Sequence, residues 1–456
     1  MTELSLGGER ADTSARSASS LYRAVWRWHF YAGLLVLPFM IILALTGALY
    51  LFHTEIDGII HADLKRVEAR AGVPAVPPSA MVAKALAAHP GTAIRYTTPA
   101  DPGASAEITI ETPAHGKLAV YVDPYSGHVL GALPDRGTVM WVVRQLHSLS
   151  YLGRFGQALI ELAAGWSILL VGTGTYLWWP RRRRGGVVSV RGRPKHRVFW
   201  RDLHAVTGLF VGVFMVFLAA TGMPWSVLWG STVNGWLNAS NYGYPAGVRV
   251  EVPMSRHHLT EQGQTAWSLE QARMPQSASG MHNPSPIGLD KAVAIFDGLG
   301  LHPGYAVSIP TNPDGVYTGS AYPRDVHQQR VAHLDQYSGK PLVDIGYADY
   351  GPLAKGIEWG ISVHQGHQFG RANQLVLLAA CLAIVALAVS AGVMWWKRRP
   401  AGSLGVPPLP SDRRTGIGLL AILAAGGIVF PLVGVSFLVM LVLDGLYVRG
   451  LRTRET

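Results

Sequence analysis

Residues 200–225 read WRDLHAVTGLFVGVFMVFLAATGMPW. The run is apolar and is long enough to span a bilayer. His204 opens it, Gly208 follows one helical turn later, and Gly222 closes it. At about 100° per residue, the histidine and the two glycines fall on nearly one face of a helix. Because glycine has no side-chain bulk, a flat and wide group such as a porphyrin can lie against this face.

The same arrangement occurs earlier in the chain. His29 precedes Gly33 and Gly47 by the same offsets, and in both copies a threonine stands directly before the closing glycine. A histidine inside a membrane costs free energy, so by default it marks a functional site. The alternative is an interfacial histidine anchored beside tryptophans. The duplication and the glycines count against that alternative.

The composition is that of a membrane protein. The chain has 456 residues, of which 49% are hydrophobic and 15% are charged, and its net charge is +11. A basic chain can bind nucleic acid, but here the basic residues flank the apolar runs, so we expect no nucleic-acid partner. The single cysteine, Cys381, lies in an apolar run and excludes a disulfide or a thiolate metal site within one chain.

The hydropathy pattern predicts a membrane α-helical bundle. Its five spans cover residues 29–52, 157–179, 204–229, 372–396 and 416–443. The fifth contains Pro431 and is long enough to tilt or kink. No small-residue cleavage site follows the first span, so we expect it to be an anchor and not a removed signal peptide.

The distribution of Lys and Arg predicts the topology. Basic clusters before the first span and after the second and fourth place these ends in the cytoplasm. The cytoplasmic parts are then residues 1–28, 180–203 and 397–415, and the external parts are 53–156 and 230–371. The pattern assigns no side to the tail, 444–456. We therefore expect a multi-pass membrane protein with a cytoplasmic N-terminus.

Each external segment predicts a small α+β module. The expected helices are residues 79–88 and 289–299, and the expected strands are 93–98, 107–112, 118–122, 305–309 and 315–321. Both modules contain the same kind of turn, Asp123-Pro-Tyr-Ser-Gly127 and Asp335-Gln-Tyr-Ser-Gly339. The insertion 230–284 has no counterpart, and we interpret its histidines as solvated loop residues. They are His257, His258 and His282.

Two further histidines extend the repeat. His147 and His364 lie the same number of residues before the pairs Trp178-Trp179 and Trp395-Trp396. The chain is therefore predicted to form two tandem units, each with a span, an external α+β module and a second span. The fifth span is appended to them.

The four repeated histidines predict two cofactor sites. Two axial ligands of one iron lie within a few ångströms of it, whereas opposite membrane ends lie about 30 Å apart. His29 and His204 begin spans at the cytoplasmic end, and His147 and His364 lie at or before the external ends. The expected pairs are therefore His29 with His204 and His147 with His364, as bis-histidine haem requires.

Several other residues compete for these roles. His53 also lies at the external end of a span, and His367 could replace His364 as a ligand or contact a propionate. Five arginines are candidates for pairing with haem propionates, namely Arg27, Arg144, Arg154, Arg201 and Arg371.

Other cofactors are less well supported. A zinc site usually shows carboxylates or cysteines near its histidines, and we expect no such site in the spans. No glycine-rich nucleotide-binding loop links a strand to a helix, and we interpret Gly172-Thr-Gly-Thr175 as a packing element of its span. Without a nucleotide site, electrons would come from quinol or from a cytoplasmic protein.

The motifs together resemble a known family. They are Trp28-His29 with Gly33 and Thr46-Gly47, Leu146-His147, Asp202-Leu-His204 with Gly208 and Thr221-Gly222, His364-Gln-Gly366 with Phe369-Gly370, and the closing Trp-Trp-Lys-Arg-Arg399. Over about residues 22–400 they resemble the PepSY-associated transmembrane-helix family, and the external modules look like its PepSY domains. The fifth span and the insertion 230–284 depart from the family's four-span pattern.

The resemblance implies a function. Characterised relatives include inner-membrane ferric-siderophore reductases that carry two b-type haems on such histidines. We therefore expect an oxidoreductase that contains two haem b groups and reduces an external ferric siderophore or other ferric chelate. The alternatives are a non-redox envelope regulator or peptidase-modulating protein and a transporter. The pattern assigns no catalytic residue, and the expected partners are membrane lipid, the electron donor and the external chelate.

Overall fold

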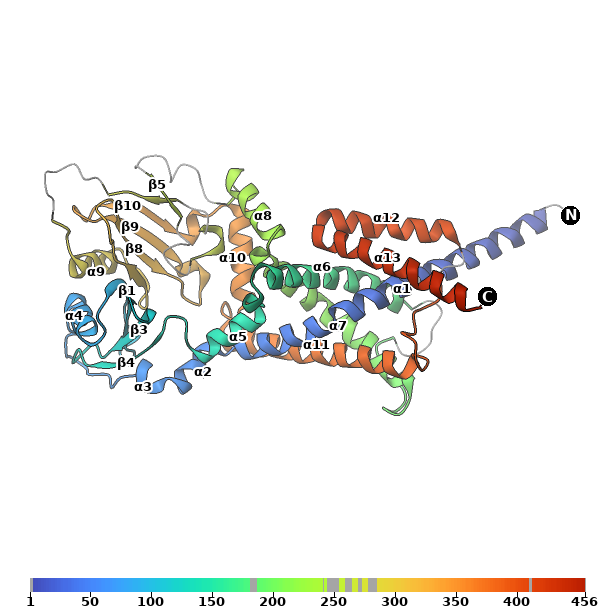
Figure 1. Cartoon of the computed structure of the whole chain (residues 1–456), viewed down its shortest axis with the longest axis horizontal. Helices are drawn as coiled ribbons and strands as arrows, with labels where there is room; N and C mark the ends of the chain where they lie inside the picture. The colour runs from blue at the N-terminus through green and yellow to red at the C-terminus, as the bar shows by residue number, and fades with distance from the viewer. Residues whose placement is uncertain are drawn as a thin grey trace. The chain divides into compact units, whose positions relative to one another are not determined.

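A computed structural model describes residues 3–180, 187–240, 242–243, 254–258, 265–269, 273–277, 285–409 and 412–455. The chain divides into two compact units (Figure 1). The membrane unit contains Met1–Ala48, Gln145–Ser231 and Leu375–Thr456, and the sheet unit contains Leu49–Arg144 and Thr232–Gln374. His282 lies outside the described residues, as do the side chains of His257 and His258.

The membrane unit is built from long apolar helices. They are α1 (Glu3–Tyr50), α6 (Gly153–Trp178), α7 (Arg197–Gly222), α11 (Gly370–Arg398), α12 (Arg413–Val429) and α13 (Pro431–Glu455). Among the described residues, five helical segments are long and apolar enough to cross a membrane, namely Ser20–Tyr50, Ser150–Trp178, Arg197–Trp225, Gly370–Arg398 and Pro431–Arg449. Large apolar side chains such as Phe210, Val213 and Leu438 are exposed on them. Helices that are apolar on all sides are expected of a protein with lipid around it.

The C-terminal part differs from the single fifth span predicted over 416–443. The structure divides it into α12 and α13, which pack against each other as a hairpin. Pro431 cannot continue α12 and instead begins α13. A Cβ on Gly427 would lie 2.5 Å from the Cα of Gly434, so the tight turn requires glycine there. The hairpin returns the chain to the side on which α12 began, and Figure 1 shows both termini at the same end of this unit.

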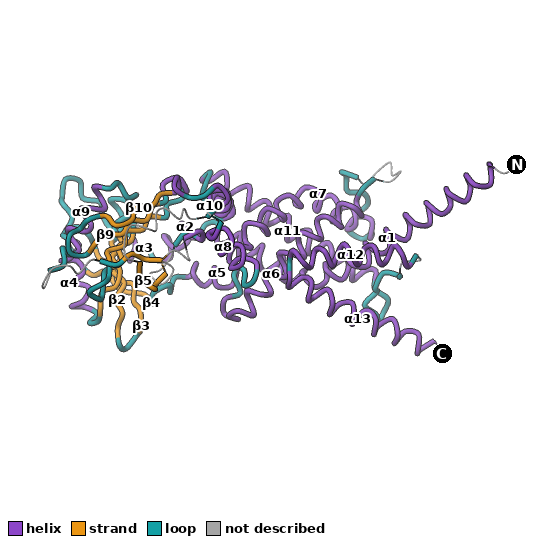
Figure 2. Tube along the Cα trace, turned by 90° about the horizontal axis from the view of Figure 1, so that it is seen from above, coloured by secondary structure: helices purple, strands orange, loops and turns teal. Residues whose placement is uncertain are grey.

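The sheet unit contains one antiparallel sheet of eight strands in the order β10-β9-β8-β7-β1-β2-β3-β4. The strands are β1 (Thr92–Thr97), β2 (Ala106–Thr112), β3 (Gly116–Val122), β4 (Val129–Pro134), β7 (Ala306–Ser308), β8 (Val316–Ala321), β9 (Arg330–Asp335) and β10 (Pro341–Gly346). All of them, orange in Figure 2, belong to this unit. Helices α4 (Pro78–Ala88) and α9 (Leu289–Gly298) pack into one core with the sheet. Pairing between β1 and β7 joins the strands of the two segments that were predicted to be external.

The predicted turns occur at equivalent points of this sheet. The Asp123 carboxylate accepts hydrogen bonds from Tyr125 N at 2.8 Å and Ser126 Oγ at 2.6 Å. The Asp335 carboxylate accepts from Ser338 N at 2.8 Å. The closing glycines, Gly127 and Gly339, have φ of +67° and +73°, which favours glycine.

The remaining elements are short. They are α2 (His53–Ile60), α3 (Ala62–Lys65), α5 (Val139–His147), η1 (Ser150–Leu152), η2 (Met223–Trp225), α8 (Trp229–Ala239), β5 (Met254–His258), η5 (Trp267–Leu269), β6 (Arg273–Pro275), η6 (Val326–Gln328), η7 (Tyr347–Asp349) and α10 (Pro352–His364). The insertion, interpreted as loop-rich, thus begins with a helix and contributes the two-stranded sheet β5-β6.

Candidate functional site

His29, on α1, is held by a hydroxyl group of α6. Its Nδ1 lies 2.8 Å from Thr173 Oγ1. The Thr173 hydroxyl lies 2.9 Å from the Leu169 carbonyl, and when it donates its proton there, its oxygen accepts a hydrogen bond from Nδ1–H. The network therefore assigns the neutral tautomer in which His29 Nε2 carries a free lone pair.

His204, on α7, is held in the same way by α11. Its Nδ1 lies 3.2 Å from the Leu387 carbonyl oxygen and 3.3 Å from Ser390 Oγ. A carbonyl oxygen can only accept, so Nδ1 is the donor. The Ser390 hydroxyl in turn donates to the Leu387 carbonyl at 2.7 Å. His204 Nε2 therefore also carries its lone pair.

His147, at the end of α5, repeats the arrangement against α1. Its Nδ1 lies 3.0 Å from Thr46 Oγ1, and that hydroxyl donates to the Ile42 carbonyl at 2.6 Å. The hydroxyl oxygen therefore accepts from the imidazole N–H. Three of the four predicted histidines thus present the same tautomer.

Glycine beside the threonine lets two of these rings lie close to the neighbouring helix. A Cβ on Gly174 would lie 3.2 Å from His29 Cε1, and a Cβ on Gly47 would lie 3.2 Å from His147 Cε1. Both contacts are tighter than ordinary van der Waals packing. Of the other predicted glycines, Gly33 has open space beside it, and Gly208 has Leu387 Cδ1 at 3.4 Å. Gly222 ends α7.

His29 and His204 lie in the same unit, within range of an electrostatic interaction between their rings. That they ligate one haem stays a prediction. His364 ends α10 in the sheet unit, and its pairing with His147 stays a prediction.

The residues that hold His29 and His204, namely Thr173, Leu387 and Ser390, were not predicted from the sequence. The interpretation of Gly172-Thr-Gly-Thr175 as a packing element was incomplete, because Thr173 and Gly174 contact His29. The signal was present: the same dipeptide, Thr46-Gly47, had been noted in the first span. Ser390 gave a weaker signal, since it matches Thr173 only when the two Trp pairs are aligned.

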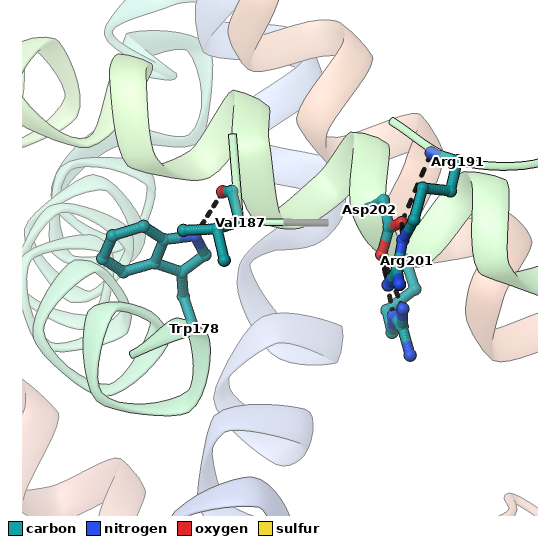
Figure 3. A network of polar contacts seen from close by, with 5 residues as sticks. All are labelled: Trp178, Val187, Arg191, Arg201 and Asp202. Atoms are coloured by element: carbon teal, nitrogen blue, oxygen red, sulfur yellow. Dashed lines mark hydrogen bonds and ion pairs between the residues drawn. The ribbon is translucent and has the colours of Figure 1, made fainter. Parts of the chain in front are cut away.

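A buried charge stands two residues before each histidine of this pair. Arg27 contacts the Asp444 carboxylate of α13. Asp202 accepts hydrogen bonds from Arg191 Nε at 2.8 Å and Arg201 Nη2 at 2.7 Å, as Figure 3 shows. Only 4% of Arg27 and 1% of Asp202 are exposed. Arg27 and Arg201, predicted as propionate partners, thus make ion pairs within the protein.

Figure 3 also shows a contact between α6 and the described part of the loop that follows it. The indole Nε1 of Trp178, at the end of α6, donates to the Val187 carbonyl at 2.8 Å. Together with the Arg191–Asp202 contact, this bond ties the described part of the loop to α6 and α7.

The competing histidines lie in the sheet unit. His53 Nδ1 donates to the Tyr50 carbonyl at 2.8 Å, and its ring centroid lies 5.5 Å from that of His367. Burial, with the neighbouring His53, lowers the pKa of His367 to about 4. Arg371, another predicted propionate partner, lies 3.4 Å from Glu55 Oε1.

Glu161 is a further buried group that the prediction missed. This carboxylate lies within α6 and is 1% exposed. Its Oε2 accepts a hydrogen bond from Leu228 N at 2.9 Å, and Oε1 has no partner among the described residues. The contact caps a backbone N–H just after α7 ends.

Comparison with known protein families shows which part of the chain matches a family model. The family model described as PepSY-associated TM region matches residues 26–398. This range contains all four predicted histidines and ends before α12. A comparison with curated proteins gave no match.

Proposed function

We propose, from the premise that this chain belongs to the PepSY-associated TM family, that it is a membrane electron-transfer protein. It would hold two b-type haems and reduce a ferric siderophore or other ferric chelate outside the cytoplasm. The donor would be quinol or a cytoplasmic protein. The setting would be the bacterial inner membrane, with the N-terminus in the cytoplasm.

The observation that supports haem best is the common tautomer of three histidines. Iron takes neutral imidazole through a nitrogen lone pair, and ligand histidines almost always donate their other N–H to a fixed acceptor. In His29 and His204, Nδ1 donates to an oxygen atom of a neighbouring helix, which places the lone pair on Nε2, and His147 Nδ1 lies 3.0 Å from the Thr46 hydroxyl in the same way. His53 also donates Nδ1–H to a carbonyl oxygen, so the support comes from the recurrence of this arrangement at three of the four repeated histidines.

The surroundings of these histidines also fit a flat apolar group. Open space lies beside Gly33, on the helix that carries His29. The glycines at 47 and 174 keep the neighbouring helix surface free of side chains next to His147 and His29. His29 and His204 would hold one haem, and His147 with His364 would hold the other. When bound, each haem would supply a one-electron carrier.

The sheet unit is proposed to consist of two PepSY modules. A helix followed by four strands occurs on each side of the β1–β7 pairing. We interpret the two sets as the tandem modules that the sequence repeat predicts.

The test is a haem count followed by a redox assay. The full-length protein, purified in detergent, should give two haem b per chain in a pyridine haemochrome assay and a low-spin, six-coordinate spectrum. After reduction with dithionite and removal of the excess, ferric citrate or a ferric hydroxamate should reoxidise it. Protein without haem would contradict the proposal, and haem that no ferric chelate reoxidises would contradict its reductase part.

A further inference from the structure

The C-terminal hairpin lies outside the matched family region, yet it packs beside His29. The match ends at residue 398, and α12 begins at Arg413. Residues of both hairpin helices share a buried core with α1 and α6, which includes Trp28, Ala32, Trp166, Leu423, Val433 and Phe437. His29 and Thr173 line a small gap together with Leu423 of α12. The hairpin is therefore part of the surroundings of the His29 site.

A buried ion pair joins the hairpin to the residue two positions before His29. Arg27 Nε lies 3.3 Å from Asp444 Oδ2, and its Nη2 contacts Oδ1, so the pair is bidentate. The Tyr31 hydroxyl also donates to Asp444 Oδ1. The two charged side chains are 5% and 13% exposed. Removing one partner would leave the other charge buried and uncompensated.

These contacts are made by the face of α1 that is opposite to the His29 imidazole. Arg27 and Tyr31 are one helical turn apart and share a face, whereas His29 lies about 200° round the helix from Arg27. Trp28, directly before the histidine, packs on Phe437 of α13 with ring centroids 4.9 Å apart. The hairpin therefore fixes the rotation of α1 that presents His29 to Thr173.

We infer that Asp444 of the hairpin is a positioning residue for His29 and that, by neutralising Arg27, it lowers the redox potential of the haem that His29 would hold. The inference rests on the proposed function. A buried positive charge near a haem favours the ferrous state, because the ferric state carries one more positive charge. The effect persists in the poorly screened interior of the membrane unit.

The experiment measures, in the full-length chain, the redox potential of the haem that His29 and His204 would hold, called here the inner haem. Asp444→Asn keeps the size and the hydrogen-bonding oxygen of the side chain but removes its charge. In a His147→Ala background, which should retain only the inner haem, the midpoint potential should rise. A tenfold change in the ferrous-to-ferric ratio, which is 59 mV for a one-electron couple, is the expected scale.

Two further variants separate charge from packing. Arg27→Gln should lower the potential, because it removes the positive charge, and Arg27→Gln with Asp444→Asn should return it toward the wild-type value. Arg27→Gln also serves as the test if Asp444→Asn does not assemble. The matched control is Ser436→Ala, which removes the 2.8 Å bond from Trp166 Nε1 to the same hairpin without touching Arg27. It should leave the potential unchanged.

The outcomes also distinguish the inference from the function on which it rests. Wild-type protein without haem would defeat the proposed function. A fully loaded Asp444→Asn variant with the wild-type potential, or an equal shift in Ser436→Ala, would overturn the role of Asp444 alone.

Discussion

The two histidines of the inner pair are held by the same kind of contact but anchored by different ones. His29 and His204 each donate Nδ1–H to oxygen atoms of a later span, at Thr173 or at Leu387 and Ser390. Two residues before His29 stands a buried arginine that is held by the C-terminal hairpin. Two residues before His204 stands a buried aspartate that is held by one arginine of the loop between α6 and α7 and by one of α7 itself. The comparison indicates that the tautomer with Nδ1–H as donor is what the two histidines have in common. The ion pair that anchors each helix near its histidine differs between them.

The largest difference between His29 and His204 is expected when the hydroxyl groups beside them, those of Thr173 and Ser390, are removed. Thr173→Val leaves His29 Nδ1–H buried without an acceptor, so haem affinity at the inner site should fall roughly 10–100-fold. Ser390→Ala should cost less, because the Leu387 carbonyl still accepts from His204 at 3.2 Å. Haem titration of the two variants measures the difference. Thr173→Ser, which retains the hydroxyl, is the control, and equal losses in both variants would contradict the assigned donors.

A smaller effect is expected from the residue after each hydroxyl. Gly174→Ala would place a Cβ 3.2 Å from His29 Cε1, which should cost about 1 kcal/mol through overpacking and shift the inner haem spectrum. On α11, the residue that follows Ser390 is already an alanine, Ala391. Ala391→Gly should therefore leave the haem spectrum unchanged. A spectral change in Ala391→Gly but not in Gly174→Ala would show that the ring contacts are wrongly assigned.

The smallest effect on the haem site is expected from a histidine in the sheet unit. His333 Nδ1 also lies near a hydroxyl, 2.9 Å from Thr318 Oγ1, but within the sheet. Burial lowers its pKa to about 4, so the folded state keeps it neutral while the unfolded state binds a proton below its ordinary value of 6.5. Stability should therefore fall as the pH drops from 6.5 toward 4.

His333→Leu should reduce that loss of stability and leave the haem content unchanged. Thermal unfolding at several pH values and a haem count measure the two effects. A loss of haem in this variant would mean that contact with a hydroxyl marks ligands wherever it occurs.

The sequence predicted the spans and the histidines because both depend on local pattern. Apolar runs of sufficient length, and a histidine repeated with two glycines, can be read without knowing the packing. The partners of the histidines are harder to predict, since Thr173 and Ser390 are separated from them by long stretches of chain. Only the repeated Thr-Gly dipeptide pointed to Thr173.

The misses have physical causes. Pro431 was compatible with a kinked span, and only the close approach of Gly427 to Gly434 makes the chain reverse there. The Arg27–Asp444 pair joins the two ends of the chain, so no local pattern predicts it. Glu161 was missed because a single carboxylate barely lowers the hydropathy of its span.

The central claim is that His29 and His204 hold one and the same haem. The direct test is the haem content and absorption spectrum of His29→Ala, His204→Ala and the double variant, each purified as the full chain. Both single variants should lose the same spectral component, and the double variant should lose no more than either, because ligands of one iron act as a unit. Loss of different components in the two single variants, or a greater loss in the double variant, would contradict the claim.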